Sequence, residues 1–101
     1  MALGEPPEAD EHGRTPLYNA CLNGHVDAAR SLLAQGADIN RVRNDGISPL
    51  YIACQEGHVD AARLLLDKGA EVDRANKNGE TLLYMACENG HVEAARLLLE
   101  N

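Results

Sequence analysis

The sequence has no tryptophan and no phenylalanine, and three tyrosines are its only aromatic residues. Its interior must therefore be built from leucine, alanine, valine and isoleucine. Basic residues are also few, since 9 Lys and Arg stand against 16 Asp and Glu, which gives a net charge of −7. Nucleic acids and anionic membranes recruit basic surfaces, so this balance argues against both as the main partner.

Long apolar runs are absent as well. No stretch approaches the roughly 20 apolar residues that a transmembrane helix needs. The first ten residues hold no basic residue and no apolar core of the signal-peptide type. We therefore expect a protein of the cytoplasm or the nucleus, with reduced thiols.

A seven-residue motif occurs three times in the chain, at intervals of 33 residues. It begins at Thr15, Ser48 and Thr81, and each copy is followed two residues later by Gly-His-Val. A fixed period of this length indicates one small structural unit that is repeated. The chain has room for a single domain. We predict a flexible segment at 1–9 and a repeat domain at 10–101, with repeats at about 10–42, 43–75 and 76–101.

Each unit contains start and stop signals for two short helices. In the second unit, Ser48 has the hydroxyl that suits the position before a helix, and Pro49 suits the first helical position. Gly57 can adopt the left-handed conformation that ends this helix. A second helix is predicted from His58 onward, and Gly69 terminates it.

Between the units, Asp45-Gly46 and Asn78-Gly79 predict hairpin-like turns. With this pattern the chain resembles the ankyrin repeat family. In the second unit the resemblance rests on Asp45-Gly46, Ser48-Pro49-Leu50, Ala53, Gly57-His58, Leu64-Leu65-Leu66, Gly69-Ala70 and Asp73. It implies an all-α solenoid of helix-turn-helix units joined by β-hairpin-like loops. It also implies a non-catalytic module, without a cofactor, that binds a protein partner on a concave surface of hairpin tips and first helices.

The chain departs from the family in one column of the repeat. Tyr18, Tyr51 and Tyr84 follow the Thr-Pro-Leu position, where the family usually has histidine. A phenol is longer than an imidazole and cannot copy the contacts of that histidine with the capping hydroxyl and the backbone. Either the phenol reaches a more distant hydrogen-bond partner, or it presents an aromatic face near the binding groove.

Every unit also holds a cysteine and a histidine four residues apart, namely Cys21 with His25, Cys54 with His58 and Cys87 with His91. Such pairs can serve as a nucleophile with its base or as metal ligands. However, a helix-ending glycine breaks the helical alignment of each pair, and equivalent residues of stacked helices lie about 8 to 10 Å apart. That distance is too long for a disulfide or a shared zinc ion. We predict no catalytic and no metal site, with buried thiols and, as the resemblance implies, histidines that hydrogen-bond to backbone.

Charged residues fall into two groups. Opposite charges three residues apart predict a solvated outer face on the second helices: Asp27 with Arg30, Asp60 with Arg63 and Glu93 with Arg96. Four of the nine basic residues lie instead in the hairpin regions: Arg41, Arg43, Arg74 and Lys77. This second group, the basic rim, either keeps exposed turns soluble or meets an acidic peptide.

Partner-binding residues can be sought where the three units differ, because positions fixed by packing should be the same in each unit. Drift without function produces the same differences, so both explanations stay open. Within this set we expect Leu22, Ile47, Ile52 and Met85 to be exposed apolar anchors of an interface. With the basic rim included, the candidates are Arg14, Leu22, Asn23, Arg41, Arg43, Asp45, Ile47, Ile52, Gln55, Glu56, Arg74, Lys77, Asn78, Glu80, Met85, Glu88 and Asn89.

The two terminal units show no dedicated polar cap. A free-standing stack needs polar outer faces, yet the last unit repeats the apolar residues of the middle one, from Val92 to Leu99. One interpretation is that the chain is a piece of a longer or designed array. The other is that the chain self-associates through its C-terminal repeat. A structural or engineered fragment of this kind is the alternative to partner binding on the concave surface.

Overall fold

The computed structural model describes residues 9–72 and 77–100, and over these residues the chain forms six helices and no strand. The helices are α1 (Pro16–Leu22), α2 (Val26–Ala34), α3 (Pro49–Gln55), α4 (Val59–Asp67), α5 (Leu82–Glu88) and α6 (Val92–Leu99). This confirms the predicted all-α fold class. Residues 1–8 of the predicted flexible segment and Arg74 of the basic rim lie outside the described residues.

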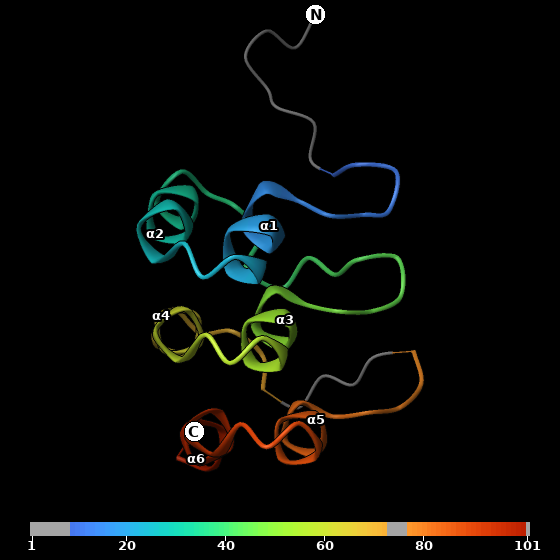
Figure 1. Cartoon of the computed structure of the whole chain (residues 1–101). Helices are drawn as coiled ribbons and strands as arrows, with labels where there is room; N and C mark the ends of the chain where they lie inside the picture. The colour runs from blue at the N-terminus through green and yellow to red at the C-terminus, as the bar shows by residue number, and fades with distance from the viewer. Residues whose placement is uncertain (1–8, 73–76, 101) are drawn as a thin grey trace, which may run out of the picture.

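The helices form two parallel columns, with α1, α3 and α5 in one and α2, α4 and α6 in the other (Figure 1). Each helix packs against its partner in the same unit and against the equivalent helix of the next unit. The connecting turns project from the column of first helices, away from the second (Figure 1). The stack measures 45 × 27 × 20 Å, so it is an elongated solenoid.

The first helices begin where the capping hydroxyls predict. Each hydroxyl oxygen accepts a hydrogen bond from the backbone N–H of the residue three positions later. The N···O distances are 3.0 Å for Thr15 and Tyr18, 3.0 Å for Ser48 and Tyr51, and 3.2 Å for Thr81 and Tyr84. Each bond satisfies one of the donors that a helix start leaves without an intrahelical acceptor. In α1 and α3, proline occupies the first turn, where its missing N–H costs nothing.

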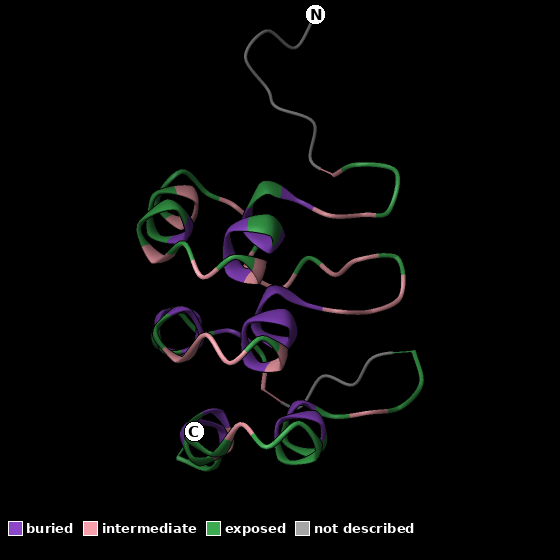
Figure 2. Ribbon diagram, viewed as in Figure 1, coloured by how far each residue is buried: buried purple, intermediate pink, exposed green. Residues whose placement is uncertain are grey.

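The core lies between the two columns and between neighbouring repeats (Figure 2). Leucines fill it, with Leu17, Leu50, Leu65 and Leu82 at most 1% exposed. Small residues stand where the columns meet, and Ala29 is fully buried there. No helix in the described part of the chain is long and apolar enough to cross a membrane.

Candidate functional site

The turn that precedes α3 is closed by backbone hydrogen bonds of the hairpin type. The N–H of Arg43 donates to the carbonyl of Ile47 at 2.8 Å, and the N–H of Gly46 donates back to the carbonyl of Arg43 at 2.8 Å. Gly46 has φ +88°, a conformation in which a Cβ would be strained. The predicted Asp45-Gly46 turn is therefore present, although no strand extends from it within residues 9–72 and 77–100.

Neighbouring turns bond to each other along the stack. The N–H of Asn44 donates to the carbonyl of His12 at 3.0 Å, and its side-chain amide donates to the carbonyl of Glu11 at 3.1 Å. Further along, the N–H of Lys77 donates to the carbonyl of Asp45 at 3.1 Å. These bonds hold the turns at fixed positions beside the first helices, so side chains on them form one surface.

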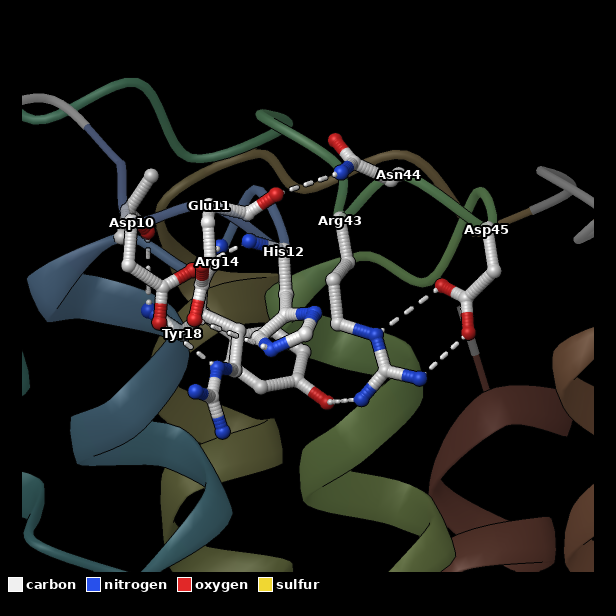
Figure 3. Close-up of polar contacts among 9 residues, drawn as sticks. Asp10, Glu11, His12, Arg14, Tyr18, Arg43, Asn44 and Asp45 are labelled. Carbon is white, nitrogen blue, oxygen red and sulfur yellow. Dashed lines mark hydrogen bonds and ion pairs between the residues drawn. The ribbon is translucent and has the colours of Figure 1, made fainter.

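Arg43 of the basic rim lies among side chains of its own chain rather than pointing freely into solvent. Its guanidinium donates to both carboxylate oxygens of Asp45 and, through Nη1, to the hydroxyl of Tyr18 at 3.1 Å (Figure 3). The hydrogen bonds that Arg43 donates to Asp45 raise the pKa of Arg43. Burial acts to raise the pKa of Asp45, but its bonds with Arg43 and Ile47 outweigh burial and lower it. Both groups therefore stay charged, and Asp45 offsets part of the rim's positive charge.

Arg14 is paired as well. Its Nε donates to the carboxylate of Asp10 at 2.8 Å, and Asp10 also accepts the backbone N–H of His12 (Figure 3). Asp10 was not among the candidates, since its role depends on how the first turn folds back. Arg14 and Arg43 line a shallow hollow of about 400 Å³ between the first and second turns, together with His12, Asn44 and Asp45.

A second hollow, of about 560 Å³, lies between α3 and α5. The candidate residues among those that line it are Gln55, Glu56, Glu80, Met85, Glu88 and Asn89. We call this the α3–α5 hollow. The structure thus brings together six candidates that the sequence separates by up to 34 positions. Three of the six are glutamates, so this part of the surface is acidic.

The candidate residues differ widely in exposure. Among them, Asn23, Arg41, Glu56, Lys77, Asn78, Glu88 and Asn89 are exposed. A second group is half-buried: Arg14, Leu22, Arg43, Asp45, Ile47, Gln55 and Glu80. The two remaining described candidates, Ile52 and Met85, are only 3% and 5% exposed.

The expectation that Ile52 and Met85 are exposed anchors is therefore wrong. The equivalent residue of the first repeat is Asn19, and Asn19 is exposed. This column is buried in the two repeats that have a described repeat before them, which indicates that it faces the preceding unit. The difference between Asn19 and its two counterparts follows from position in the stack and not from a partner.

The tyrosine column realises the first of the two alternatives, a more distant hydrogen-bond partner, in the first repeat. Tyr18 is 1% exposed and its hydroxyl accepts the Arg43 bond, whereas Tyr84 is 52% exposed and donates to Oε2 of Glu88 at 2.8 Å. Burial raises the pKa of Tyr18, and the Arg43 guanidinium opposes the rise without cancelling it. Tyr51 is buried like Tyr18. The phenol thus reaches a distant partner in the first repeat and presents an open ring in the third.

The histidines bond to backbone across repeats. Nε2 of His58 lies 3.1 Å from the carbonyl oxygen of Leu22, and Nε2 of His91 lies 2.7 Å from that of Gln55. This confirms the predicted structural role for His58 and His91. Cys21 and Cys54 are buried as predicted, but Cys87 is exposed, because no described repeat follows to cover it. Among the described residues, no three His, Cys, Asp or Glu side chains are placed to hold one metal ion.

Family models match this architecture over most of the chain. A model described as "Ankyrin repeats (3 copies)" matches residues 40–101, and one described as "Ankyrin repeats (many copies)" matches residues 6–53. The first covers more than half of the chain. The chain belongs to the ankyrin repeat family. Its helix-turn-helix units, hairpin-type turns and glycine-histidine links are those expected from the resemblance seen in the sequence.

Curated relatives are ankyrin repeat proteins that share one repeat or slightly more with this chain. Ankyrin repeat domain-containing protein 13B of Mus musculus is 49% identical over 39 residues, which are 39% of this chain and 6% of that protein. Ankyrin repeat domain-containing protein 49 of Bos taurus is 52% identical over 33 residues, 33% of this chain and 14% of that protein. Protein phosphatase 1 regulatory subunit 27 of Homo sapiens is 46% identical over 39 residues, 39% of this chain and 25% of that protein. The matched part is thus a quarter or less of each of these relatives.

The three cysteines of this ankyrin repeat chain are expected to differ sharply in reactivity. Burial raises the pKa of Cys21 and of Cys54 to about 12, so neither forms a thiolate near neutral pH, and neither is accessible. At pH 8, iodoacetamide should therefore modify the folded chain at Cys87 alone, whereas all three thiols should react in 6 M guanidinium chloride. Peptide mass spectrometry measures the sites. A folded Cys87→Ser chain that still labels rapidly would contradict this expectation.

Proposed function

We propose that this chain binds a segment of another protein on the side formed by its first helices and hairpin turns. Ankyrin repeats are generally protein–protein interaction modules and are generally non-catalytic. One relative is named as a regulatory subunit of protein phosphatase 1, and that name describes a protein that acts on another protein. That this chain is located in the cytoplasm or the nucleus stays a prediction.

The observation that supports this surface most strongly is the α3–α5 hollow. Candidates chosen only because the repeats differ there converge on it from α3 and α5, from the residue that follows each of these helices, and from Glu80, two residues before α5. Glu56, Glu88 and Asn89 are exposed at its edge, so their side chains are accessible to a partner. Packing within the stack gives no reason for the repeats to differ at these exposed positions.

The charge at the hollow favours a basic partner segment over an acidic one. Carboxylates of Glu56, Glu80 and Glu88 surround it, and the chain as a whole is acidic. The acidic peptide suggested by the basic rim has weaker support, because Asp45 already pairs with Arg43 of the rim. Opposite charges across an interface raise the association rate and select the partner.

A triple substitution in the α3–α5 hollow tests the proposal. Gln55→Ala/Glu56→Ala/Asn89→Ala should weaken partner binding about tenfold or more, because loss of interface contacts worth about 1.4 kcal/mol in total has that effect. The folded chain should change by about 0.5 kcal/mol or less per substitution, since these side chains lie at the surface. Quantitative cross-linking to proteins of the native host, read by mass spectrometry, measures the binding.

Two control variants make the result specific. Asp60→Ala/Arg63→Ala/Glu93→Ala changes three exposed residues on the second helices and should leave recovery of the same partners unchanged. Arg41→Ala/Lys77→Ala tests the basic rim without disturbing the bond between Arg43 and Tyr18. Equal recovery with the hollow variant, or loss confined to the variant of the second helices, would rule out this surface.

A further inference from the structure

Three side chains link the first helix to the turn of the second repeat. Arg43 lies over the ring of Tyr18 in α1, with Cζ 5.7 Å from the ring centroid, and its Nη1 donates to the phenol oxygen at 3.1 Å (Figure 3). The other side of the guanidinium donates to both carboxylate oxygens of Asp45. Oδ1 of Asp45 in turn accepts the backbone N–H of Ile47 at 3.3 Å. We call Tyr18, Arg43 and Asp45 the turn relay.

The burial of the relay makes its bonds stronger than those of a surface ion pair. Tyr18 is 1% exposed, and the side chains of Arg43 and Asp45 are 35% and 43% exposed. Salt screens partly buried charges less than exposed ones, and hydrogen bonds of a charged donor are stronger than neutral ones. The guanidinium is therefore held at one end by the core of the first repeat and at the other by the turn that carries it.

Backbone bonds continue from the relay to the third turn. The carbonyl of Asp45 accepts the N–H of Lys77 at 3.1 Å. Lys77 stands three residues before Glu80, which lines the α3–α5 hollow. A change in the position of the second turn would therefore reach the edge of that hollow through one hydrogen bond and a few residues of chain.

The relay belongs to the junction of the first two repeats, although the tyrosine is present in all three. The column of Arg43 contains Asp10 in the first repeat and Asn76 in the third, and neither side chain has a guanidinium. Asn76 lies outside the described residues. In the third repeat the hydroxyl of Tyr84 bonds to Glu88 of its own helix at 2.8 Å. The difference between repeats at Arg43, which marked it as a candidate for partner binding, thus has a cause within the chain.

We propose that Tyr18 is a positioning residue for the partner-binding side of the stack and acts through Arg43 and Asp45. The buried hydroxyl anchors the guanidinium, the guanidinium anchors the second turn, and the second turn holds the base of the third. The effect on binding rests on the proposed function, whereas the effect on the turns does not. A surface that is already ordered loses less conformational entropy when a partner binds. Without the hydroxyl, Arg43 keeps only Asp45, which lies on the same turn, so the bond that ties the turn to α1 is lost.

Tyr18→Phe tests the relay, because it removes the hydroxyl and keeps the ring in the core. Amide hydrogen exchange followed by NMR reports local opening. The amides of Gly46 and Lys77 should exchange about tenfold faster, which corresponds to the loss of one hydrogen bond to a charged group. Amides inside α4 should change much less. Equal acceleration at all of these amides, or none at Gly46 and Lys77, would overturn the relay.

Two further variants make the exchange result specific. Tyr84→Phe is the matched control, since its hydroxyl bonds within its own helix, and it should leave the amides of Gly46 and Lys77 unchanged. Arg43→Lys keeps the charge, but a single ammonium cannot replace the guanidinium fork on Asp45 and reach the phenol as well. It should accelerate the same two amides, and Tyr18→Phe added to it should have little further effect. Additive effects would mean that the two side chains act separately.

Partner binding separates failure of this inference from failure of the proposed function. In the cross-linking experiment, Tyr18→Phe should lower recovery of the partners by a factor of about two to five, because a surface that is ordered part of the time binds in proportion to that fraction. Faster turn exchange with full recovery would overturn the positioning role and leave the α3–α5 hollow as the binding surface. Full recovery with the triple variant of the hollow would overturn the proposed surface and the positioning role with it, while the exchange rates would still decide whether the relay holds the turns.

Discussion

Leu50→Ala is expected to lower the free energy of unfolding by about 3 kcal/mol, within the range of about 2 to 5 kcal/mol seen for buried leucines. Leu50 is 1% exposed in α3, which packs against α1, α4 and α5. The substitution removes apolar contacts and leaves a cavity at the centre of the stack. Because about three repeats are needed for a stable array, the whole chain should unfold at lower urea concentration. Circular dichroism measures the shift.

Leu83→Ala is the matched control, because Leu83 occupies the same column in the third repeat. Its side chain is 36% exposed, so truncation there loses less buried area and leaves no enclosed cavity. We expect a loss of about 1 kcal/mol or less. Equal losses of unfolding free energy at Leu50 and Leu83 would mean one of two things. Either the third repeat is covered in solution, or the middle repeat is less tightly packed than the structure shows.

Local features of the fold could be predicted because they depend on residues close together in the sequence. The hydroxyls of Thr15, Ser48 and Thr81 need only the backbone three residues ahead, and all three cap a helix. The glycines before the second helices need only a left-handed conformation, and Gly24 and Gly57 adopt it, with φ of +71° and +74°. Because the sequence repeats every 33 residues, a correct prediction for one unit applies to the equivalent positions of the other two.

Burial could not be predicted from a single unit, because it depends on which neighbours a unit has. Met85 varies in sequence like a binding residue, yet it is buried because a repeat precedes it. Cys87 and Tyr84 have the same residue types and repeat positions as buried residues of the other two repeats. They are exposed because no described repeat follows them. Residue type alone therefore does not predict burial in the repeats at the two ends of the stack.

The basic rim shows a second limit of reasoning by sequence. Counting charges places Arg43 on an exposed turn, but its guanidinium bonds to Tyr18, which is 25 residues away in the chain. Only the stacking of two repeats brings these side chains together. In the α3–α5 hollow the same stacking joins candidates from two units, so the sequence could name members of the hollow but not their proximity.

Gly24→Ala should lower the free energy of unfolding by about 2 to 3 kcal/mol, through two separate causes. Gly24 has φ +71°, and an alanine in this region costs about 1 kcal/mol. In addition, its Cβ would lie 2.8 Å from Nδ1 of His58, which is closer than real atoms approach. The ring must move, and its 3.1 Å contact with the carbonyl of Leu22 is then lost, at about 1 kcal/mol more.

Gly90→Ala separates the two causes, since Gly90 has nearly the same φ, +73°, but nothing within 4 Å of a Cβ. Only the backbone cost of about 1 kcal/mol should appear there. The difference between the two variants measures the imidazole contact between repeats, and adding His58→Ala to both chains should remove that difference. If it persists without His58, the cost at Gly24 comes from the backbone of the first repeat and not from the packing of the second repeat against it.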